Sequence, residues 1–295
     1  MIGIRLCSPG IARQSLALST FSIRKLRCIL PRVTLSVVLI TQNEEGNLRR
    51  TLESVMPLVR DGKGEIIVVD SGSTDRTLEI ARSYGAKVFV ETWKGFAAQK
   101  NSVIEKAAMD WVLQLDADEA LEPELAAEIE VALKGDSAVK GFWIPRKNFF
   151  LGRWIRHGGF YPDPKLRLIR RGAGRFQEYG AHPTIKVDGP TGKLSHALIH
   201  YAYPTLRGYI DHMNSYSSMG AKVAVEKGCR GFSIINIMVR PLLTFIYNYF
   251  FRLGFLDGRE GLLLHLYHSA YVSWKYAKAW ELSRSSVPSK SPVET

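Results

Sequence analysis

Residues 35–75 of the chain read LSVVLITQNEEGNLRRTLESVMPLVRDGKGEIIVVDSGSTD. The two apolar runs in this segment, 36–40 and 65–69, are short and rich in Val and Ile, which is typical of buried strands. Between them, Leu48, Leu52, Val55 and Met56 recur at helical spacing. The order strand, helix, strand predicts a crossover unit of a parallel sheet.

The same alternation continues along the chain. A helical stretch at 77–84 leads to a third apolar run at 86–90, and a helical stretch at 97–108 leads to a fourth run at 111–115. Four short strands alternating with helices predict an α/β fold, in which right-handed crossovers cover both faces of a parallel sheet. Because such sheets bind ligands at the carboxyl ends of their strands, the residues after each run are the first site candidates.

The composition sets the class of protein. The chain has 295 residues, is 46% hydrophobic and carries a net charge of +12, so it supports a large core and is not a disordered chain. Residues 1–33 contain six basic and no acidic side chains, and we expect a poorly ordered basic leader there. Three scattered cysteines favour a reducing compartment over a disulfide framework or a zinc cluster.

The second half has a different texture. Short strand-like runs at 141–145, 166–169 and 184–187 are expected to complete one domain over residues 34–230. From Phe232 the chain is strongly apolar, but Arg240, Pro241 and Arg252 interrupt it, which disfavours a single clean membrane span. Aromatic residues mixed with Arg and Lys predict amphipathic, membrane-associating helices over 231–282, followed by a disordered tail at 283–295. Core or dimer-forming helices are the alternative.

Asp116 and Asp118 directly follow the fourth apolar run. Two carboxylates this close repel each other unless a cation or protons lie between them, and Mg²⁺ or Mn²⁺ is typically held by one or two carboxylates plus substrate phosphates. An acid pair in a surface turn is the alternative. The strand-end position favours a divalent cation as cofactor.

Polar clusters also follow the first two runs, at Thr41, Asn43, Glu44, Asp70 and Ser71. Ser73 or Asp75 can cap the next helix, whereas Asp70 is not needed for capping and can accept hydrogen bonds from a base or ribose. Three adjacent strand ends together predict a pocket for a nucleotide diphosphate. The glycine-rich dinucleotide motif and the Walker motif are missing after the first run, which argues against dinucleotide oxidoreductases and P-loop enzymes.

Four segments in this order resemble the successive signatures of family 2 glycosyltransferases with a GT-A fold: LSVVLITQNEE (35–45), IIVVDSGSTD (66–75), GFAAQKN (95–101) and LQLDADE (113–119). Later segments, YPD with LRL (161–168), HY (200–201), and GFLDG with KY (254–276), resemble the bacterial branch that includes lipopolysaccharide-core β-1,4-glucosyltransferases. The resemblance spans residues 34–282. It implies a Rossmann-like nucleotide-diphospho-sugar transferase fold with C-terminal amphipathic helices.

The resemblance also implies roles for individual residues. For the nucleotide it implies contacts from Thr41, Asn43 and Glu44 at the nucleoside, from Asp70 and Ser71 at the base or ribose, from Gln99, Lys100 and Asn101 on the following helix, and from Asp116. Asp116 and Asp118 would hold the metal that neutralises the diphosphate and improves the leaving group. His200 is either a further metal ligand or a satisfied structural histidine.

Family behaviour implies inversion by single displacement, in which a carboxylate takes the proton of the attacking acceptor hydroxyl. Relatives commonly place this acid in a Val-His-Glu setting, but here Pro183 stands where that Glu would be. We expect Glu178 to be the base, with Asp163 of the YPD segment as the alternative, and Glu178 can also be an ordinary surface acid. Arg167 is expected either to contact a phosphate or the acceptor, or to lie at a solvated strand end.

These features predict a membrane-associated, metal-dependent transferase at the cytoplasmic face of the inner membrane. It would move a hexose from a nucleotide-diphosphate sugar, with a UDP-sugar as the expected donor, to a lipopolysaccharide-core or other lipid-linked saccharide. Transfer to polyprenyl phosphate or another envelope glycan is the alternative. Because the Val-His-Glu motif is missing, a non-catalytic scaffold protein with the same fold is a second alternative. Nucleic acid is not an expected partner, because the aromatic residues concentrate in the apolar C-terminal segment.

Overall fold

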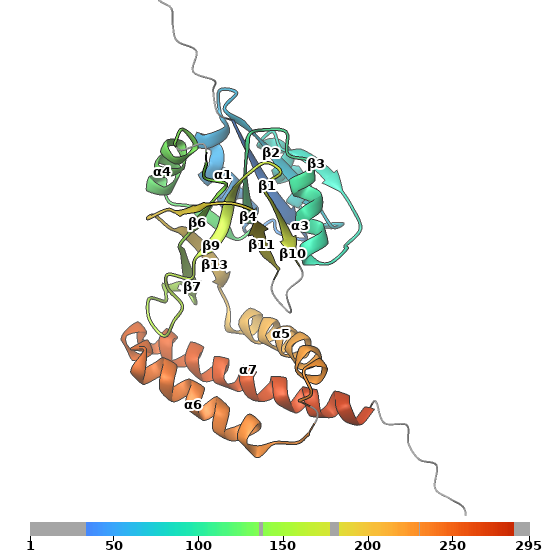
Figure 1. Cartoon of the computed structure of the whole chain (residues 1–295), viewed down its shortest axis with the longest axis vertical. Helices are drawn as coiled ribbons and strands as arrows, with labels where there is room; N and C mark the ends of the chain where they lie inside the picture. Colours follow the sequence, from blue (N-terminus) through green and yellow to red (C-terminus); the bar gives the residue numbers. More distant parts are fainter. Residues whose placement is uncertain (1–33, 136–137, 178–182, 230, 286–295) are drawn as a thin grey trace, which may run out of the picture. The chain divides into compact units, whose positions relative to one another are not determined.

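The computed structural model describes residues 34–135, 138–177, 183–229 and 231–285 (Figure 1). The predicted leader at 1–33 and most of the predicted tail lie outside these ranges, as does Glu178, the expected base.

The centre of the fold is a seven-stranded mixed sheet. In spatial order its strands are β12 (Thr191–Lys193), β6 (Gly141–Ile144), β9 (Lys165–Arg170), β4 (Trp111–Asp116), β1 (Leu35–Thr41), β2 (Gly64–Asp70) and β3 (Lys87–Val90). The strands β4, β1, β2 and β3 are parallel, as the sequence predicted, whereas β9 runs antiparallel to β4 and β6. The register pairs Thr41 with Asp70 and Ile40 with Asp116, so the ends of β1, β2 and β4 lie side by side.

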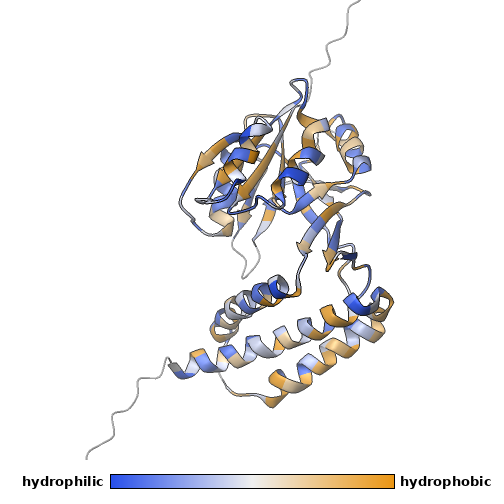
Figure 2. Cartoon of the chain, turned by 180° about the vertical axis from the view of Figure 1, so that it is seen from behind, coloured by the Kyte–Doolittle hydropathy of each residue, from blue (hydrophilic) through white to orange (hydrophobic). Residues whose placement is uncertain are grey.

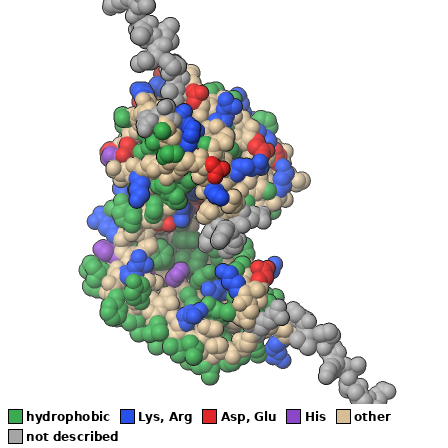
Figure 3. Space-filling view, in the orientation of Figure 1, with side chains coloured by type: hydrophobic (Ala, Val, Ile, Leu, Met, Phe, Trp, Pro, Cys, Tyr) green, Lys and Arg blue, Asp and Glu red, His purple; other side chains and the backbone are tan. Residues whose placement is uncertain are grey.

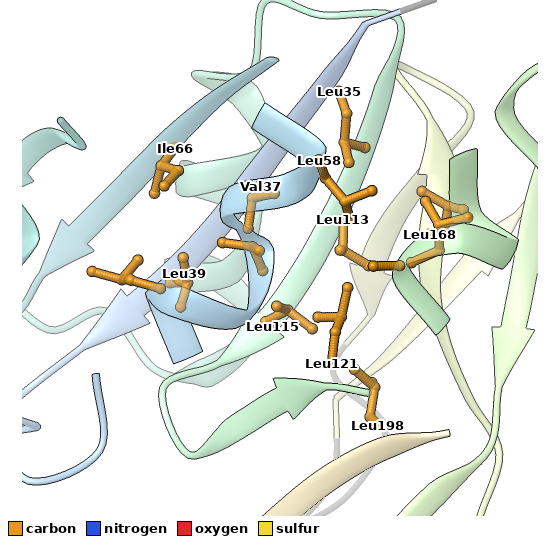
Figure 4. Close-up of a cluster of buried hydrophobic side chains, with 14 of the residues drawn as sticks. Leu35, Val37, Leu39, Leu58, Ile66, Leu113, Leu115, Leu121, Leu168 and Leu198 are labelled. Atoms are coloured by element: carbon orange, nitrogen blue, oxygen red, sulfur yellow. The ribbon is translucent and has the colours of Figure 1, made fainter. Parts of the chain in front are cut away.

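Helices cover this sheet because alternate residues of each strand point to opposite faces. Val37 and Leu39 of β1 enter one core with the apolar side of α1 (Leu48–Val59) and with α4 (Pro123–Leu133), and Figure 4 shows part of this cluster. Val38 enters a second core with α3 (Phe96–Glu105), and α2 (Thr77–Ser83) joins β2 to β3. Each fully buried aliphatic side chain of this kind stabilises the fold by roughly 1.5–3 kcal/mol.

A second sheet, whose strands alternate along the chain with those of the central one, has four strands in the order β5 (Glu119–Leu121), β13 (Leu198–Tyr203), β7 (Arg146–Phe150) and β8 (Arg153–Trp154). A separate hairpin pairs β10 (Gly174–Gln177) with β11 (Thr184–Val187). In the four-stranded sheet, His200 of β13 lies opposite Glu119 on one side and Asn148 on the other. This pairing brings the HY segment next to the residues that follow β4.

The C-terminal part of the described chain is helical (Figure 1). Helix α5 (Leu206–Glu226) packs along α7 (Gly258–Ser285), and the segment between them forms the π-helical turns η1 (Ile235–Val239) and η2 (Tyr247–Phe251), helix α6 (Arg240–Ile246) and the 3₁₀ turn η3 (Gly254–Asp257). The sequence patterns did not indicate α5. Within the described segments, none of the helices combines the length and apolarity that crossing a bilayer requires.

The GFLDG segment anchors these helices to the loop after β8. The buried carboxylate of Asp257 accepts hydrogen bonds from the backbone N–H groups of Arg156 (3.2 Å) and His157 (2.8 Å), and it contacts Nδ1 of His157 at 3.0 Å. The buried ring of His265 lies so close to Gly158 that a Cβ there would fall 1.9 Å from it. Gly158 also has a φ of +66°, so both its backbone and its contact require glycine.

Replacing Asp257 with Ala should test this anchor. Asp257→Ala leaves the backbone N–H groups of Arg156 and His157 without their acceptor and removes a buried carboxylate, so we expect the free energy of unfolding in urea to fall by roughly 2–3 kcal/mol. Asp211→Ala is the matched control, because the Asp211 side chain is 72% exposed and only 3.8 Å from Arg207 in an exposed pair. The control should change stability by less than about 0.5 kcal/mol. Equal effects of the two variants would contradict the anchor.

Candidate active site

The polar ends of β1 and β2 are joined by the buried carboxylate of Asp70. Its oxygens accept hydrogen bonds from the hydroxyl of Thr41 (2.7 Å), from the backbone N–H groups of Gly72 (2.9 Å) and Ser73 (2.7 Å), and from the hydroxyl of Ser73 (2.5 Å). Four donors of the protein therefore surround the Asp70 carboxylate, which the sequence analysis expected to bind a base or ribose. Asp70 shapes the turn that presents Ser71.

A second link joins the loops after β1 and β2. The backbone N–H of Asn43 donates to the hydroxyl of Ser73 at 2.8 Å, and Oδ1 of Asn43 accepts from the backbone N–H of Thr74 at 2.8 Å. Asn43 adopts a φ of +56°, in the left-handed region that asparagine tolerates better than most residues. The two loops thus form one continuous rim at the edge of the sheet.

Glu44 lies on this rim close to the carboxylates after β4. Burial raises the pKa of Glu44, and the negative charges of Asp118 and Asp116 act in the same direction, against a hydrogen bond from Asn47. Glu44 therefore belongs to the same site as the two aspartates.

The three predicted residues of α3 have different partners. Nε2 of Gln99 donates to the hydroxyl of Ser71 at 3.3 Å, and its buried Oε1 has no hydrogen-bond partner in the described part of the chain. Lys100 is buried, and its Nζ lies 2.5 Å from Oδ1 of Asp116. Both ends of the Asn101 amide bond to the backbone of Phe176, so Asn101 is a structural link between α3 and β10, a role that the sequence reading did not anticipate.

Asp116 is held by two cationic side chains. Oδ1 contacts Nζ of Lys100, and Oδ2 contacts the guanidinium of Arg167 at 2.5 Å. Burial alone would raise the pKa of Asp116, but the charges of Arg167 and Lys100 outweigh it and hold its pKa well below its usual range. Asp116 is therefore fully ionised and already neutralised within the protein. Its role as a metal ligand beside Asp118 stays a prediction, and these contacts show which side chains hold its carboxylate in the described structure.

The guanidinium of Arg167 also contacts Glu119 at 2.7 Å and Gln114. Arg167 is only 5% exposed, so it does not lie at a solvated strand end, and its expected contact with a phosphate or the acceptor stays a prediction. Glu119, fully buried, then pairs with Arg146 at 3.0 Å, and Arg146 pairs with Asp163 at 2.7 Å. We call this run of alternating charges, Asp116, Arg167, Glu119, Arg146 and Asp163, the buried charge chain.

Asp163 ends this chain with both oxygens engaged. Oδ2 accepts from Arg146 and from Nδ2 of Asn148 at 3.1 Å, and Oδ1 contacts Lys165 at 2.8 Å. Burial would raise the pKa of Asp163, but the charges of Arg146 and Lys165 outweigh it and lower the pKa. Asp163 is ionised at neutral pH, as a general base must be, although its cationic neighbours weaken it as a proton acceptor.

Asp118, the second aspartate of the strand-end pair, lies beside His200. Nε2 of His200 lies 3.3 Å from Oδ2 of Asp118, while Nδ1 of His200 contacts Oδ1 of Asn148 at 2.7 Å. Burial opposes ionisation of Asp118, but the hydrogen bond and charge of His200 outweigh it and lower its pKa. An ionised carboxylate facing an imidazole oriented by an amide fits a divalent cation.

The described residues contain no group of three His, Cys, Asp or Glu side chains arranged to hold a metal ion. Mg²⁺ commonly takes one or two protein ligands and completes its shell with water and substrate phosphates. The donor set of Asp118 and His200 is consistent with that mode of binding.

A cavity of about 340 Å³ adjoins this pair. Arg146, Asn148, Asp163 and His200 line it from the second sheet and the loop before β9, and residues of η2 and α7 line it from the helices. Figure 3 shows a hollow between the sheet region and the helices. His200 thus links the cavity, which it lines, to Asp118, which it contacts beside the end of β4.

The sequence reading missed Gln114, Glu119, Arg146 and Asn148. The sequence did contain an indication of Glu119, because acids rarely follow an apolar strand as closely as this third acid of LQLDADE does. The basic residue between two buried leucines in LRL likewise indicates a buried cation. Glu178, the expected base, lies outside the described residues.

The family model described as glycosyl transferase family 2 matches residues 36–187. The lipopolysaccharide core biosynthesis glycosyltransferase LpsC of Rhizobium meliloti is 30% identical over 237 residues, which cover 78% of this chain and 84% of that protein. The uncharacterized glycosyltransferase RT0209 of Rickettsia typhi is 30% identical over 264 residues, covering 85% and 88%.

Among solved structures, the chain is similar to the mannosyltransferase PcManGT from Pyrobaculum calidifontis in complex with GDP-Man and Mn²⁺, with 16% identity, a TM-score of 0.45, and coverage of 86% of this chain and 76% of that chain. The expected GT-A type of α/β fold, with helices at the C-terminal end, is confirmed. On its sequence and its family match, the chain belongs to glycosyl transferase family 2.

Proposed function

We propose that this glycosyltransferase inverts the anomeric centre of a hexose as it transfers it from a nucleotide-diphosphate sugar, with a UDP-sugar as the expected donor, to a lipopolysaccharide-core or other lipid-linked saccharide. One observation carries the proposal. Asp118 lies beside the polar strand ends and contacts His200, which lines the cavity. A donor on the strand ends and an acceptor in the cavity would meet at this pair.

The donor side is supported by an unsatisfied acceptor. Buried polar atoms are nearly always hydrogen-bonded, yet Oε1 of Gln99 has no partner within the described residues. The N–H of a base or a ribose hydroxyl would satisfy it, next to Ser71 and the Asn43 rim. Lys100 and Arg167 neutralise Asp116 beside this place, so a diphosphate would meet less repulsion from that carboxylate.

Asp118 and His200 would hold the divalent cation, Mg²⁺ or Mn²⁺. When bound, the cation would neutralise charge on the diphosphate and so make it a better leaving group. Asn148 orients the imidazole of His200 through Nδ1, which leaves Nε2 directed at Asp118.

The reaction is a single displacement at the anomeric carbon. The acceptor oxygen forms a bond to that carbon, the bond between the carbon and the phosphate oxygen breaks, and the nucleoside diphosphate leaves with the electron pair. The acceptor hydroxyl proton passes to a carboxylate of the enzyme. We propose Glu178 as that base, with Asp163 on the cavity wall as the alternative. The hydrogen bonds that Asp163 accepts from Arg146 and Asn148 favour a positioning role for Asp163 over the role of base.

The lipid-linked acceptor is supported by the name of the relative LpsC, a lipopolysaccharide core biosynthesis glycosyltransferase. It is also supported by an exposed apolar face on the C-terminal helices, which Figure 2 colours as hydrophobic. We call this the apolar face, and its large exposed members are Phe232, Ile234, Ile235, Met238, Val239, Leu242, Leu243, Tyr247, Phe250, Phe251, Leu253, Phe255 and Leu256. Such a face fits the membrane interface, and we propose that the protein binds the cytoplasmic side of the inner membrane.

Binding of UDP should depend on Mn²⁺ through Asp118. In titration calorimetry, Asp118→Asn should weaken UDP binding in the presence of Mn²⁺ by about 100-fold, because a phosphate-bound cation contributes several kcal/mol. His200→Gln should weaken it in the same direction. His196→Gln is the control, because His196 lies on the surface beside Glu128 and should leave binding unchanged. UDP binding by the unaltered protein that does not respond to Mn²⁺ would contradict the metal assignment.

Transfer should be measured with labelled UDP-sugars and two acceptors offered in parallel, truncated-core lipopolysaccharide and polyprenyl phosphate. We expect label in the lipopolysaccharide, whereas label only in the polyprenyl product would favour the alternative acceptor. Glu178→Gln should lower kcat by 10²–10⁴-fold with UDP affinity unchanged, which is the usual loss on removing a general base. If Asp163→Asn shows that loss and Glu178→Gln does not, Asp163 is the base. Absence of both UDP binding and transfer would favour the scaffold.

Membrane binding should depend on the apolar face. In flotation with vesicles that contain anionic lipids, the double variant Leu242→Ser with Phe251→Ser should bind at least about tenfold more weakly, because each buried side chain of this size contributes roughly 1.5–3 kcal/mol. The matched control is Val131→Ser on α4, whose side chain is equally exposed but lies away from the face. Equal binding of the double variant and the control would exclude this face as the docking surface.

A further inference from the structure

Several side chains that line the cavity beside His200 have no role in the transfer reaction proposed above. Its volume of about 340 Å³ lies in the range of small-molecule sites. On the side of the sheet its lining includes the aromatic rings of Phe149, Phe160 and Tyr203. Rings of this kind combined with a few placed polar groups are the usual lining of a ligand pocket, and they offer flat apolar faces to a sugar ring.

The helices contribute the polar part of the other wall. Asn248 and Arg252 of the η2 region and His268 of α7 line the cavity. No side-chain hydrogen bond within the described residues uses Asn248, so its amide is available to hydroxyl groups. The part of the cavity formed by the C-terminal helices therefore carries donors and acceptors that the fold itself does not consume.

The charges of the lining are unbalanced in the positive direction. Asp163 is the single acid among the described lining residues, and Arg146 and Lys165 already neutralise it. Arg252, in contrast, has no carboxylate partner among the described residues, and its guanidinium lies 5.9 Å from the ring centre of Tyr247. An unpaired guanidinium on a cavity wall favours an anionic ligand, because its planar donor fork matches phosphate and carboxylate oxygens.

Close contacts with the backbone at Gly158 and Gly159 fix the position of Arg252. A Cβ on Gly159 would fall 2.1 Å from Nη1 of Arg252, so the guanidinium lies directly against a glycine that also has a φ of +88°. The carbonyl oxygen of Arg252 accepts the N–H of Gly158 at 2.8 Å. Asp257 holds the residues just before this glycine pair, as described above. The GFLDG segment thus fixes the loop against which Arg252 rests.

We propose that this cavity binds the acceptor sugar and that Arg252 binds an anionic group, a phosphate or a carboxylate, which the acceptor carries. The inference deepens the proposed function and rests on it for the identity of the occupant. Phe251 and Leu253, the neighbours of Arg252 in the chain, belong to the apolar face. An acceptor anchored in a lipid surface would therefore reach the cavity beside the residues that touch that surface.

Binding of three sugars that differ in one group tests the charge preference. In titration calorimetry or ligand-observed NMR, glucose 6-phosphate and glucuronate should bind at least about tenfold more tightly than glucose, since hydrogen bonds to a charged group are about twice as strong as neutral ones. The order of the two anions distinguishes a phosphate from a carboxylate. Binding of both anions no tighter than glucose would overturn the proposal.

Two variants assign the effect to Arg252. Arg252→Ala should remove the preference for the anionic sugars and raise the KM for the lipopolysaccharide acceptor about tenfold. Arg252→Lys should keep only part of the anion preference, because lysine lacks the planar donor fork of arginine. Arg284→Ala is the matched control, since Arg284 also rests on an aromatic ring, Trp280 at 5.0 Å, but does not line this cavity. An unchanged anion preference in Arg252→Ala would overturn the assignment.

The two proposals fail in different ways. UDP binding with Mn²⁺ does not involve Arg252 and should be the same in Arg252→Ala as in the unaltered protein. If the unaltered protein binds neither UDP nor donor sugar but still prefers anionic sugars through Arg252, the transferase proposal fails and the anion site stands. If UDP binds and no sugar anion does, the transferase proposal stands and the anion site fails.

Discussion

The buried charge chain from Asp116 to Asp163 is the interaction on which the rest of the site depends. Arg167 lies inside the protein, where an unpaired charge would be strongly unfavourable, so it must keep both Asp116 and Glu119 as partners. These residues come from β4, β5 and β9, and Arg146 extends the chain to β7. Removing Arg167 would leave Asp116 and the fully buried Glu119 each with one cationic partner fewer, and breaking a buried pair in this way costs about 3–5 kcal/mol.

This constraint separates the two aspartates of the strand end. Asp116 pairs with Lys100 and Arg167, whereas the carboxylate of Asp118 contacts His200 and has no Lys or Arg partner among the described residues. The same chain reaches Asp163 on the cavity wall. One electrostatic network of a few ion pairs therefore supports both the strand-end side and the cavity side of the site.

Much of the fold could be predicted from local pattern. The strands around Val37, Ile67 and Leu113 are short apolar runs, and their order with helices implies the parallel sheet and the edge at which its ligands bind. Helix α5 escaped prediction because its sequence mixes Ser, Gly and Tyr, which weakens the apolar periodicity. The role of Arg167 escaped because its partner Asp116 lies 51 positions away, and no local pattern reports such a pairing.

The sequence by itself determined the class of fold, the polar strand ends with Asp70, Asp116 and Asp118, and the family, because these depend on short-range periodicity and on motifs that lie within a few residues of each other. Only the tertiary structure decided which aspartate is already neutralised, that His200 meets Asp118, and that Arg252 stands on a cavity wall. The reason is physical. Ion pairing, burial and cavity lining depend on distances between segments far apart in the chain, which folding alone brings together.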